Sequence, residues 1–303
     1  MSNTTATLAR SITWAGSKQT YFTAYLMVDR PLVDDCYRAY GYFRWADDVV
    51  DAVAQSFEER ISFIRRQKEL MEHLYEGERV SDLAPEEKLL ADLIHNDGGI
   101  NSGLQSFIRN FMAVLEFDAH RKERLITEDE LTWYANTLGK AVTDCIQHFI
   151  GNGHPYADHE DRHLAATAAH ITHMLRDLPE DVKEGYINIA GDDLQESSIR
   201  LEDLDNPEFR AWVKGRVNHA REYFRRGKHY LDSLEVLRCK IVGYWYCARF
   251  ESVLDRIERD GFELQVEYNE RHRLSSWLKF VWTTICVTLK HVRQRAMNRV
   301  NSP

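Results

Sequence analysis

The sequence predicts an all-α protein. Glycine and proline together account for 21 of the 303 residues, about 7% where roughly 12% is usual. Leucine, arginine, glutamate and alanine fill long stretches without turn signals, and neither a glycine-rich phosphate loop nor a run of short alternating strands is present. We therefore expect a single helical domain over residues 1–303.

Apolar residues recur with helical periodicity in nine segments. These are residues 33–53, 57–75, 86–95, 104–121, 128–150, 162–178, 207–233, 237–259 and 274–297. We expect residues 1–16 to form a flexible N-terminus. We expect residues 273–303 to form an amphipathic helix followed by a tail.

The net charge of −9 arises from 48 acidic and 39 basic side chains. This balance argues against nucleic acid as a partner, because binding to a phosphate backbone requires a basic face. It is compatible with an anionic substrate, since metal ions can bridge carboxylates to phosphates.

The five cysteines are scattered and show no Cys-x-x-Cys or zinc-type spacing. We interpret them as reduced thiols of a cytoplasmic protein. Residues 1–10 contain no apolar signal core. The apolar stretch 277–289 is too short to span a bilayer and contains Lys279. We therefore expect neither a targeting signal nor a transmembrane helix.

The first candidate site is an acidic cluster near residue 50. On a helix, Asp47 and Asp51 lie one turn apart on one face, and the same stripe continues back to Arg44 and Tyr40. Asp48 adds a third carboxylate. Like charges at this spacing destabilise a helix by a few tenths of a kcal/mol unless a cation lies between them. Mg²⁺, which takes one or two carboxylates together with substrate phosphates, would supply that cation.

A second acidic cluster repeats this form. Asp177 and Asp181 have the same four-residue spacing, again with an arginine, Arg176, just upstream. The face continues back through His173 and His170. Either cluster alone is also typical of a solvated acidic turn. Two of them, each preceded by arginine and set in a long apolar helix, indicate a paired metal site.

Such a pair suits the ionisation of an allylic diphosphate, in which the diphosphate leaves as an anion and a carbocation is formed. Metal ions act as Lewis acids on the leaving group, and arginines add charge-assisted hydrogen bonds. A dry cavity lined by aromatic rings would hold the cation. The chain has 34 aromatic residues, as 7 Trp, 14 Tyr and 13 Phe. We predict a Mg²⁺-dependent isoprenoid synthase, with Mn²⁺ as the alternative ion.

Four segments, in this order along the chain, resemble the squalene/phytoene synthase family. They are residues 18–51, 134–142, 170–185 and 248–262. The resemblance implies a helical bundle of the class I isoprenoid synthase type around a deep central cavity. It also implies head-to-head joining of two prenyl diphosphates, of C15 or C20 length, through a cyclopropyl intermediate.

From the chemistry of these residues and the resemblance together, we predict three sets of functional residues. The catalytic set would be Tyr40, Asp47, Asp51, Tyr134, His173, Asp177 and Asp181. The substrate contacts would be Lys18, Tyr21, Arg44, His170, Arg176 and Arg249. The metal ligands would be Asp47, Asp48, Asp51, Asp177 and Asp181.

The second cluster departs from the family pattern at two histidines. His170 and His173 stand where the family usually has glutamine and asparagine. Magnesium prefers oxygen ligands, whereas histidine suits softer ions such as manganese or zinc. Three roles are open for His173: a residue beside the metal, a proton acceptor near the diphosphate, or a hydrogen-bond partner of Asp177 one turn away.

Two further segments also differ. After the second cluster, the family has Gly-Arg-x-Tyr-x-Pro where this chain has Gly-Tyr-Ile-Asn-Ile-Ala over residues 185–190. The arginine and tyrosine that are lost were candidates for diphosphate contact. Near the N-terminus, Lys18 replaces a hydroxyl side chain and would supply a phosphate contact in its place.

The leading prediction is a head-to-head prenyltransferase that makes a squalene-like or phytoene-like hydrocarbon. The alternative is a class I terpene cyclase, or a prenyltransferase of non-standard regiochemistry, on the same scaffold. A third reading is a non-catalytic assembly protein, but such a protein would be expected to lose the aspartates. No dinucleotide fingerprint is visible, and the use of NADPH stays open, as does the oligomeric state.

The C-terminal stretch 273–299 combines apolar and basic side chains. It contains Trp277, Phe280, Val281, Trp282, Ile285 and Leu289 beside Lys290, Arg293, Arg295 and Arg299. A basic amphipathic helix can lie on a membrane surface, which predicts peripheral membrane contact. The alternative is a terminal helix that packs on the bundle and leaves a solvated basic face.

Overall fold

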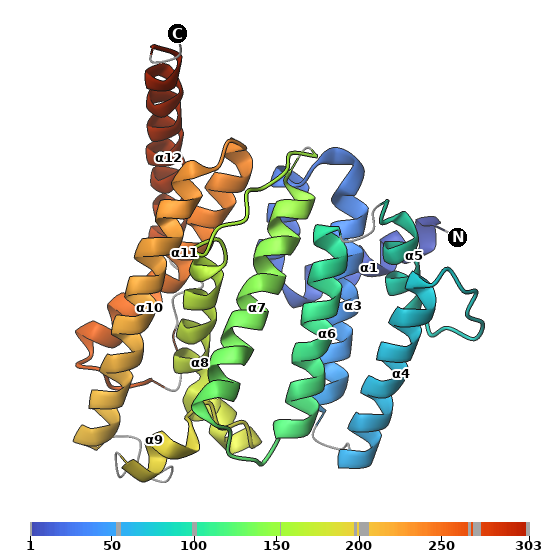
Figure 1. Ribbon diagram of the computed structural model, residues 1–303, viewed down its shortest axis with the longest axis horizontal. Helices are drawn as coiled ribbons and strands as arrows, with labels where there is room; N and C mark the ends of the chain where they lie inside the picture. Colours follow the sequence, from blue (N-terminus) through green and yellow to red (C-terminus); the bar gives the residue numbers. More distant parts are fainter. Residues whose placement is uncertain are drawn as a thin grey trace. The chain divides into compact units, whose positions relative to one another are not determined.

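The computed structural model describes residues 2–52, 56–98, 102–151, 153–196, 199, 206–265, 268 and 274–300. It confirms the all-α prediction (Figure 1), because the only β-type pairing in these ranges is an isolated bridge between Ile126 and Ala190. The chain forms two compact units. Unit 1 comprises Met1–His120 and Asp144–His154, and unit 2 comprises Arg121–Thr143 and Pro155–Pro303. A single domain over the whole chain stays a prediction.

The helices reproduce the nine predicted segments and add three. The first half of the chain forms α1 (Ser2–Gly16), α2 (Lys18–Met27), the 3-10 turn η1 (Arg30–Leu32), α3 (Val33–Asp51), α4 (Phe57–Tyr75), α5 (Glu87–Asn96) and α6 (Gly103–Arg121). The second half forms α7 (Glu128–Phe149), α8 (Leu164–Glu184), α9 (Gly191–Glu196), α10 (Pro207–Ser233), α11 (Leu237–Arg259) and α12 (Leu274–Val300). Helix α8 runs past its predicted end at residue 178 and through Pro179. The predicted end of α3, at Val53, lies outside the described residues.

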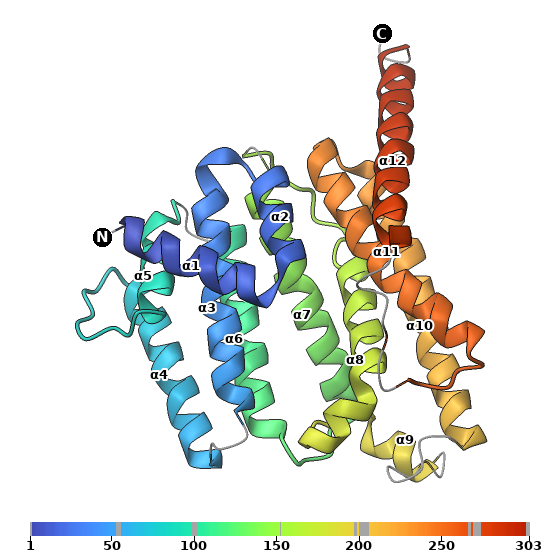
Figure 2. The same cartoon turned by 180° about the vertical axis from the view of Figure 1, so that it is seen from behind.

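The expected flexible N-terminus is wrong. Residues 2–16 form α1, which buries Ala9 and Thr13 completely and packs against α3 (Figure 2). The side chains that α1 buries are small, so the segment shows weak apolar periodicity and its sequence resembles a polar tail.

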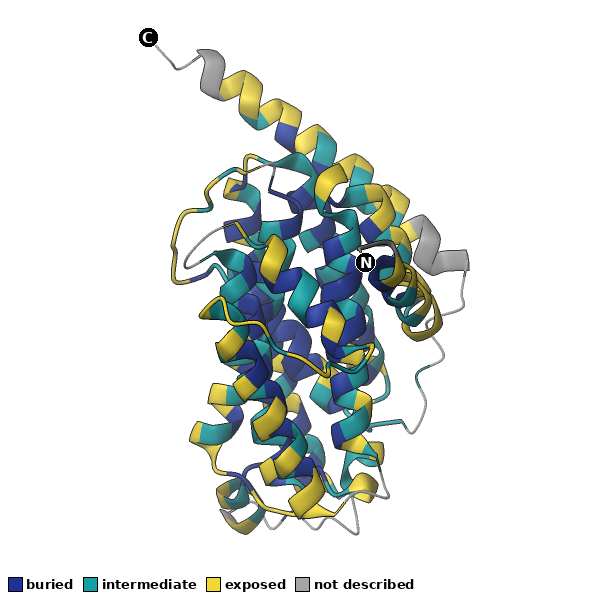
Figure 3. Ribbon diagram, turned by 90° about the vertical axis from the view of Figure 1, so that its right-hand side faces the viewer, coloured by how far each residue is buried: buried dark blue, intermediate teal, exposed yellow. Residues whose placement is uncertain are grey.

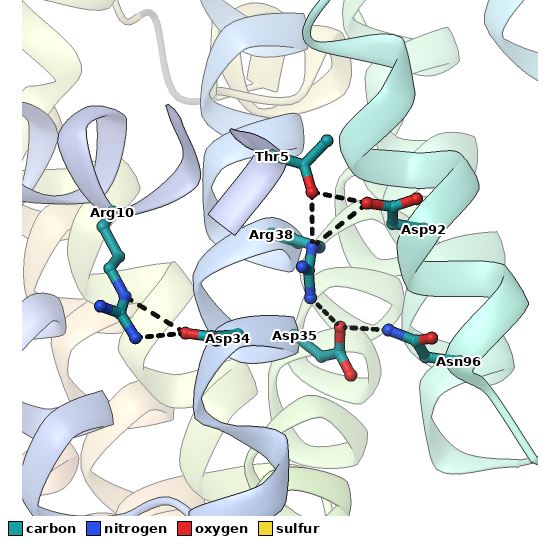
Figure 4. A network of polar contacts seen from close by, with 7 residues as sticks. All are labelled: Thr5, Arg10, Asp34, Asp35, Arg38, Asp92 and Asn96. Carbon is teal, nitrogen blue, oxygen red and sulfur yellow. Dashed lines mark hydrogen bonds and ion pairs between the residues drawn. The ribbon is translucent and has the colours of Figure 1, made fainter. Parts of the chain in front are cut away.

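A buried arginine joins α1, α3 and α5 (Figure 4). The Arg38 side chain on α3 is 3% exposed; it donates to Asp35 at 2.6 Å and to Thr5 at 3.2 Å. Thr5 in turn donates to Asp92 of α5 at 2.5 Å, and Asn96 donates to Asp35 at 3.0 Å. A buried charge is tolerated only with such partners. The network therefore fixes the helix that carries the first acidic cluster.

Aromatic packing holds the same helix on its other sides. The Phe43 ring lies 5.1 Å from the Phe107 ring and 4.5 Å from the Phe111 ring, which joins α3 to α6. The Tyr42 hydroxyl donates to Gln67 of α4 at 3.1 Å. Buried residues follow the sides of the helices that face their neighbours (Figure 3). Arg44, Asp48 and Asp51 of the polar stripe of α3 are left exposed.

In unit 2, α8 packs closely on its neighbours because glycines face it. A Cβ atom added at Gly227 of α10 would lie 2.3 Å from the backbone nitrogen of Ala165. One added at Gly139 of α7 would lie 2.3 Å from the Thr167 hydroxyl. The N-terminal half of α8, rich in alanine, is buried at these contacts. These contacts fix the helix that carries the second acidic cluster.

Two of these helices start at strong sequence signals. Thr127 precedes α7 and forms a capping box: its hydroxyl accepts from the Glu130 backbone at 3.1 Å, and its own backbone N–H donates to the Glu130 carboxylate at 2.9 Å. Asn206 caps α10 by accepting from the Phe209 backbone at 2.7 Å, and Pro207 occupies the first helical position.

Substituting glycines of α10 tests the close packing. We expect Gly227→Ala to reduce the free energy of unfolding by about 1–3 kcal/mol, because the new methyl group meets the backbone of Ala165. Gly215→Ala on the same helix, where a Cβ meets open space, should increase it by about 0.5–1 kcal/mol. Urea unfolding of both variants measures the difference; equal effects would contradict the packing.

Candidate active site

The first acidic cluster lies on α3 as the spacing predicts. Asp48 and Asp51 are exposed and Asp47 is half-buried, whereas Phe43 and Val50 of the same helix are buried. The three carboxylates therefore share the polar side of α3, and the helix itself brings them together.

Arg44 compensates these carboxylates unequally. Its guanidinium donates to Asp48 through Nε at 3.2 Å and also through Nη2, but Asp47 lies 4.0 Å from it. Burial, followed by the negative charges of Asp51 and of Asp118 on α6, raises the pKa of Asp47 to about 7. Asp118 had not been predicted as part of this site. Asp47 is thus a carboxylate whose ionisation the protein alone opposes.

Tyr40 lies one turn before Arg44 and faces the junction of α1 and α2. A Cβ atom added at Gly16 would lie 2.9 Å from the Tyr40 hydroxyl oxygen. Burial raises the pKa of Tyr40, which also shares a hydrogen bond with Ser17. The Tyr40 hydroxyl therefore lies against the turn that connects α1 to α2.

Lys18 and Tyr21, predicted substrate contacts, take part in the aromatic packing of unit 1. The Lys18 ammonium lies 5.5 Å from the centre of the Trp14 ring. The Tyr21 ring stacks on Tyr37 of α3 at 5.1 Å. Both residues lie in the same unit as the first cluster, and their contact with substrate stays a prediction.

The second acidic cluster lies on α8. Asp177 accepts hydrogen bonds from Arg176 at 2.5 and 2.6 Å, and the His173 Nε2 atom lies 2.8 Å from its carboxylate. Burial opposes the ionisation of Asp177, but these donors outweigh it and hold its pKa well below the usual range. The hydrogen bond from His173 to Asp177, one of the three open roles, is therefore present.

The ionised form of Asp181 is less well stabilised than that of Asp177. Burial and the charge of Asp177 raise the pKa of Asp181 to about 7, although Arg121 and a hydrogen bond from Asn188 act in the opposite direction. Asn188 donates to the Asp181 carboxylate at 2.8 Å and accepts from Arg121 at 2.9 Å. Asn188 therefore orients Asp181 and connects it to a buried cation.

That cation, Arg121, is the last residue of α6 and is 4% exposed. Its guanidinium lies 4.6 Å from the centre of the Tyr134 ring and 5.0 Å from that of Tyr186. Tyr134, predicted as catalytic, is thus a cation–π partner of the arginine behind Asp181. Arg121 and Asn188 had not been predicted. Asn188 lies in the altered segment 185–190, which was the available signal, and no sequence pattern singled out Arg121.

The remaining predicted residues of unit 2 lie on α8 and α11. The His170 imidazole is buried, its Nε2 has no hydrogen-bond partner in the described structure, and burial lowers its pKa to about 3. His170 is therefore neutral, and any contact with diphosphate would be as a neutral donor. The Phe250 ring lies 6.1 Å from His173 and 5.0 Å from Tyr246, and Arg249 lies over it at 5.3 Å. Aromatic rings of α11 thus lie beside the second cluster.

The predicted residues divide between the units. Unit 1 holds Lys18, Tyr21, Tyr40, Arg44, Asp47, Asp48 and Asp51, and unit 2 holds Tyr134, His170, His173, Arg176, Asp177, Asp181 and Arg249. Within the described ranges, no three His, Cys, Asp or Glu side chains converge as a ready metal site. Each cluster instead offers a small set of carboxylate oxygens, which leaves coordination positions for water or phosphate.

The raised pKa of Asp47 predicts how stability depends on pH in metal-free buffer. Folded Asp47 keeps its proton up to about pH 7, whereas an unfolded aspartate loses it near about pH 3.9. Asp47 therefore lowers stability progressively as the pH rises between these values, and not below them. We expect Asp47→Asn to increase the free energy of unfolding relative to the unchanged chain. This increase should be larger at pH 8 than at pH 4.

Urea unfolding at both pH values measures this gain. Since 41% of the Asp47 side chain is exposed, solvent screening should keep it small. Asp48→Asn is the matched control, because Asp48 is paired with Arg44 and should show no such gain. A gain for Asp47→Asn that is the same at pH 4 and pH 8 would contradict the raised pKa.

Known proteins share both the sequence pattern and the fold. Residues 15–278 match the family model of squalene/phytoene synthase. A phytoene synthase of Arthrospira platensis is 24% identical over 96% of this chain and 93% of its own length. A phytoene synthase of Thermus thermophilus is 26% identical over 51% of this chain and 52% of its own.

Solved structures show the same fold. A squalene synthase from Alicyclobacillus acidocaldarius superposes with a TM-score of 0.68 at 20% identity, covering 86% of this chain and 95% of that one. A dehydrosqualene synthase in complex with a ligand gives a TM-score of 0.72 at 15% identity, covering 95% and 96%. The fold is thus that of class I isoprenoid synthases. The chain belongs to the squalene/phytoene synthase family, whose members are prenyltransferases that act on prenyl diphosphates.

Proposed function

We propose that this chain is a Mg²⁺-dependent prenyltransferase that joins two C15 or C20 prenyl diphosphates head to head and releases diphosphate. The product would be a squalene-like or phytoene-like hydrocarbon. One observation supports this more than any other. Each acidic cluster pairs one carboxylate with an arginine and leaves another with a pKa near 7. In the first cluster these are Asp48 and Asp47, and in the second they are Asp177 and Asp181.

The residues present fit magnesium. The donors of both clusters are carboxylate oxygens, which Mg²⁺ prefers. The unfavourable ionisation of Asp47 and Asp181 is the condition that a bound cation relieves. Asp47 and Asp51 would hold metal on α3, with Asp48 beside them, and Asp177 and Asp181 would hold it on α8. Bound Mg²⁺ supplies Lewis acidity that weakens the bond between the allylic carbon and the diphosphate oxygen.

The arginines of the clusters would bind the departing diphosphate. Arg44 holds Asp48, and Arg176 holds Asp177. Diphosphate oxygens are stronger acceptors for a guanidinium, since they carry more charge and allow bidentate hydrogen bonds. Both arginines would therefore exchange a carboxylate partner for phosphate oxygens as substrate binds. That exchange frees carboxylate oxygens at the moment when they are needed for the metal.

Cleavage of the carbon–oxygen bond leaves its electron pair on the diphosphate and an allylic cation on the prenyl chain. The double bond of the second prenyl diphosphate would attack this cation, and loss of a proton to the released diphosphate would close a cyclopropane ring that still carries the second diphosphate. Loss of that diphosphate with opening of the ring would give a second cation. Loss of a proton from this cation would give a phytoene-like product, whereas a squalene-like product would require hydride from NADPH. Phe250 lies beside His173, and Tyr246 lies beside Phe250; their ring faces would stabilise positive charge.

Terpene cyclisation on the same scaffold is the second candidate. The observation that favours it is the altered surroundings of the second cluster. His170 is a neutral, buried imidazole, and Asn188 hydrogen-bonds Asp181 at a position where the family pattern has tyrosine. Such changes would act after ionisation, on the fate of the cation.

Incubation of the pure protein with C10, C15 and C20 prenyl diphosphates, with and without Mg²⁺ and NADPH, tests these functions. Mass spectrometry of the extracted products separates a coupled C30 or C40 hydrocarbon from a cyclised terpene. A coupled product that requires Mg²⁺ is the expected result. A cyclised product would favour the second candidate, and consumption of no substrate would overturn both.

We expect Asp47→Asn and Asp177→Asn each to reduce turnover by ~10²-fold or more, because each removes a charge that holds the metal and leaving group. Circular dichroism should show that both variants stay folded. Asp255→Asn is a matched control, since Asp255 of α11 forms an ion pair with Arg221 of α10 and belongs to neither acidic cluster, and it should keep full turnover. Retained activity in either cluster variant would exclude the proposed mechanism.

If His173 acts beside the metal, His173→Asn should change the preference between Mg²⁺ and Mn²⁺ or the distribution of products, because an amide oxygen is a harder ligand than imidazole. His219→Asn on α10, a half-buried histidine against Tyr223, controls for loss of an imidazole. Metal titrations of turnover and product analysis supply the measurement. Unchanged values in both would leave His173 with only its hydrogen bond to Asp177.

A further inference from the structure

We propose that α12 docks this protein onto the surface of an anionic lipid bilayer, with its outward face inserted among the lipid headgroups. The proposal is independent of the reaction that the enzyme catalyses. It rests on three observations: the fixed inward face of α12, its exposed apolar outward face, and its charge.

The inward face is anchored on α11. The Trp245 indole of α11 donates to the Thr284 hydroxyl at 2.9 Å, and its ring lies 5.9 Å from Phe280. Val287 and His291, further along the same face, are buried. The buried Lys240 reaches Gln294 at 3.3 Å. These positions recur every three or four residues, so one side of α12 is committed to packing.

The outward face is apolar and has no such cover. Its large apolar side chains are exposed over a continuous stretch of the helix. They are Val281 at 37%, Trp282 at 67%, Ile285 at 46%, Leu289 at 66% and Val292 at 59%. Exposed residues follow α12 towards the C-terminus (Figure 3). A helix that buries one side and shows an apolar stripe with tryptophan on another is typical of a segment that lies in a bilayer interface.

The charge of α12 indicates which kind of membrane surface it would bind. Residues 274–300 contain five basic residues and no acidic one. Since the whole chain has a net charge of −9, the remainder carries −14. The exposed Lys279 and Arg293 are placed beside the apolar stripe to bind anionic headgroups. The rest of the chain would be repelled by the same headgroups, which would orient the protein with α12 towards the lipid.

Two other occupants fit less well. A second copy of α12 packed on the same stripe would bring ten basic residues together, five from each helix, with no acidic residue in either helix to compensate. Insertion across the bilayer is also disfavoured, because none of the described helices is long and apolar enough to cross a membrane. Lying on the surface satisfies both the apolar stripe and the cations.

Vesicle flotation with the full chain tests the proposal. We expect binding to vesicles of mixed phosphatidylcholine and phosphatidylglycerol, weaker binding to phosphatidylcholine alone, and loss of binding at high salt. The double variant Trp282→Ser/Leu289→Ser should bind vesicles with an affinity reduced by roughly tenfold or more. Its melting temperature should be unchanged, because both side chains are already exposed. Lys279→Gln/Arg293→Gln should weaken binding only to the anionic vesicles.

Phe57→Ser and Leu125→Ser are matched controls, since these side chains are 50% and 47% exposed but lie outside α12; both should bind vesicles like the unchanged chain. Vesicle binding that survives Trp282→Ser/Leu289→Ser would overturn the proposal, as would absence of binding by the unchanged chain. Sedimentation equilibrium without lipid tests whether the apolar stripe packs instead against a second copy of the chain. A dimer that the double variant abolishes would assign the stripe to self-association instead.

A cysteine on α12 allows the contact to be observed directly. Cys286 is exposed, whereas the other four cysteines are buried or half-buried, and burial raises the pKa of the Cys36 and Cys247 thiols to about 12. A polarity-sensitive thiol dye should therefore label Cys286 selectively. We expect its emission to shift to the blue when anionic vesicles are added. An unchanged spectrum while the protein floats with vesicles would place the lipid contact elsewhere.

Discussion

Like-charged carboxylates one helical turn apart are the constraint on which this site depends. On α3 and on α8 the chain places two or more aspartates on one face, and in each case it neutralises only some of them. Arg44 pairs with Asp48, and Arg176 with His173 pairs with Asp177. Asp47 and Asp181 are left with a pKa near 7. The folded chain thus disfavours the ionised form of these two carboxyl groups, which a bound metal ion would stabilise.

The rest of each unit keeps the helix under that cluster in place. The buried Arg38 joins α3 to α1 and α5, and the Phe43 ring joins it to α6. Glycines at 139 and 227 let α7 and α10 approach α8 closely. Asn188 and Arg121 then orient Asp181 from outside its own helix. A catalytic carboxylate must be positioned within a fraction of an ångström, and rigid helices with such supports provide that precision.

The nine helices with strong apolar periodicity were predictable from the sequence, because large apolar residues recur in each at helical spacing. Helix α1 was not, since the residues that it buries, such as Ala9 and Thr13, are small. The aspartates and their arginines were predictable because residues four apart on a helix must meet. Arg121 and Asn188 were not, because they meet Asp181 through tertiary packing. Arg44 pairs more closely with Asp48 than with Asp47 because of the side-chain rotamers, which the sequence spacing alone does not determine.

Calorimetric titration of Mg²⁺ into the protein near pH 6.5 tests the central claim most directly, with and without an unreactive prenyl thiolodiphosphate. Repeating it in buffers of different ionisation enthalpy reports the protons released. Protonated carboxylates such as Asp47 and Asp181 must lose their protons to bind metal. The account therefore predicts tighter Mg²⁺ binding with the analogue, accompanied by proton release that Asp47→Asn and Asp181→Asn each reduce. An affinity for Mg²⁺ that is the same with and without the analogue, or Mg²⁺ binding that releases no protons, would contradict the account.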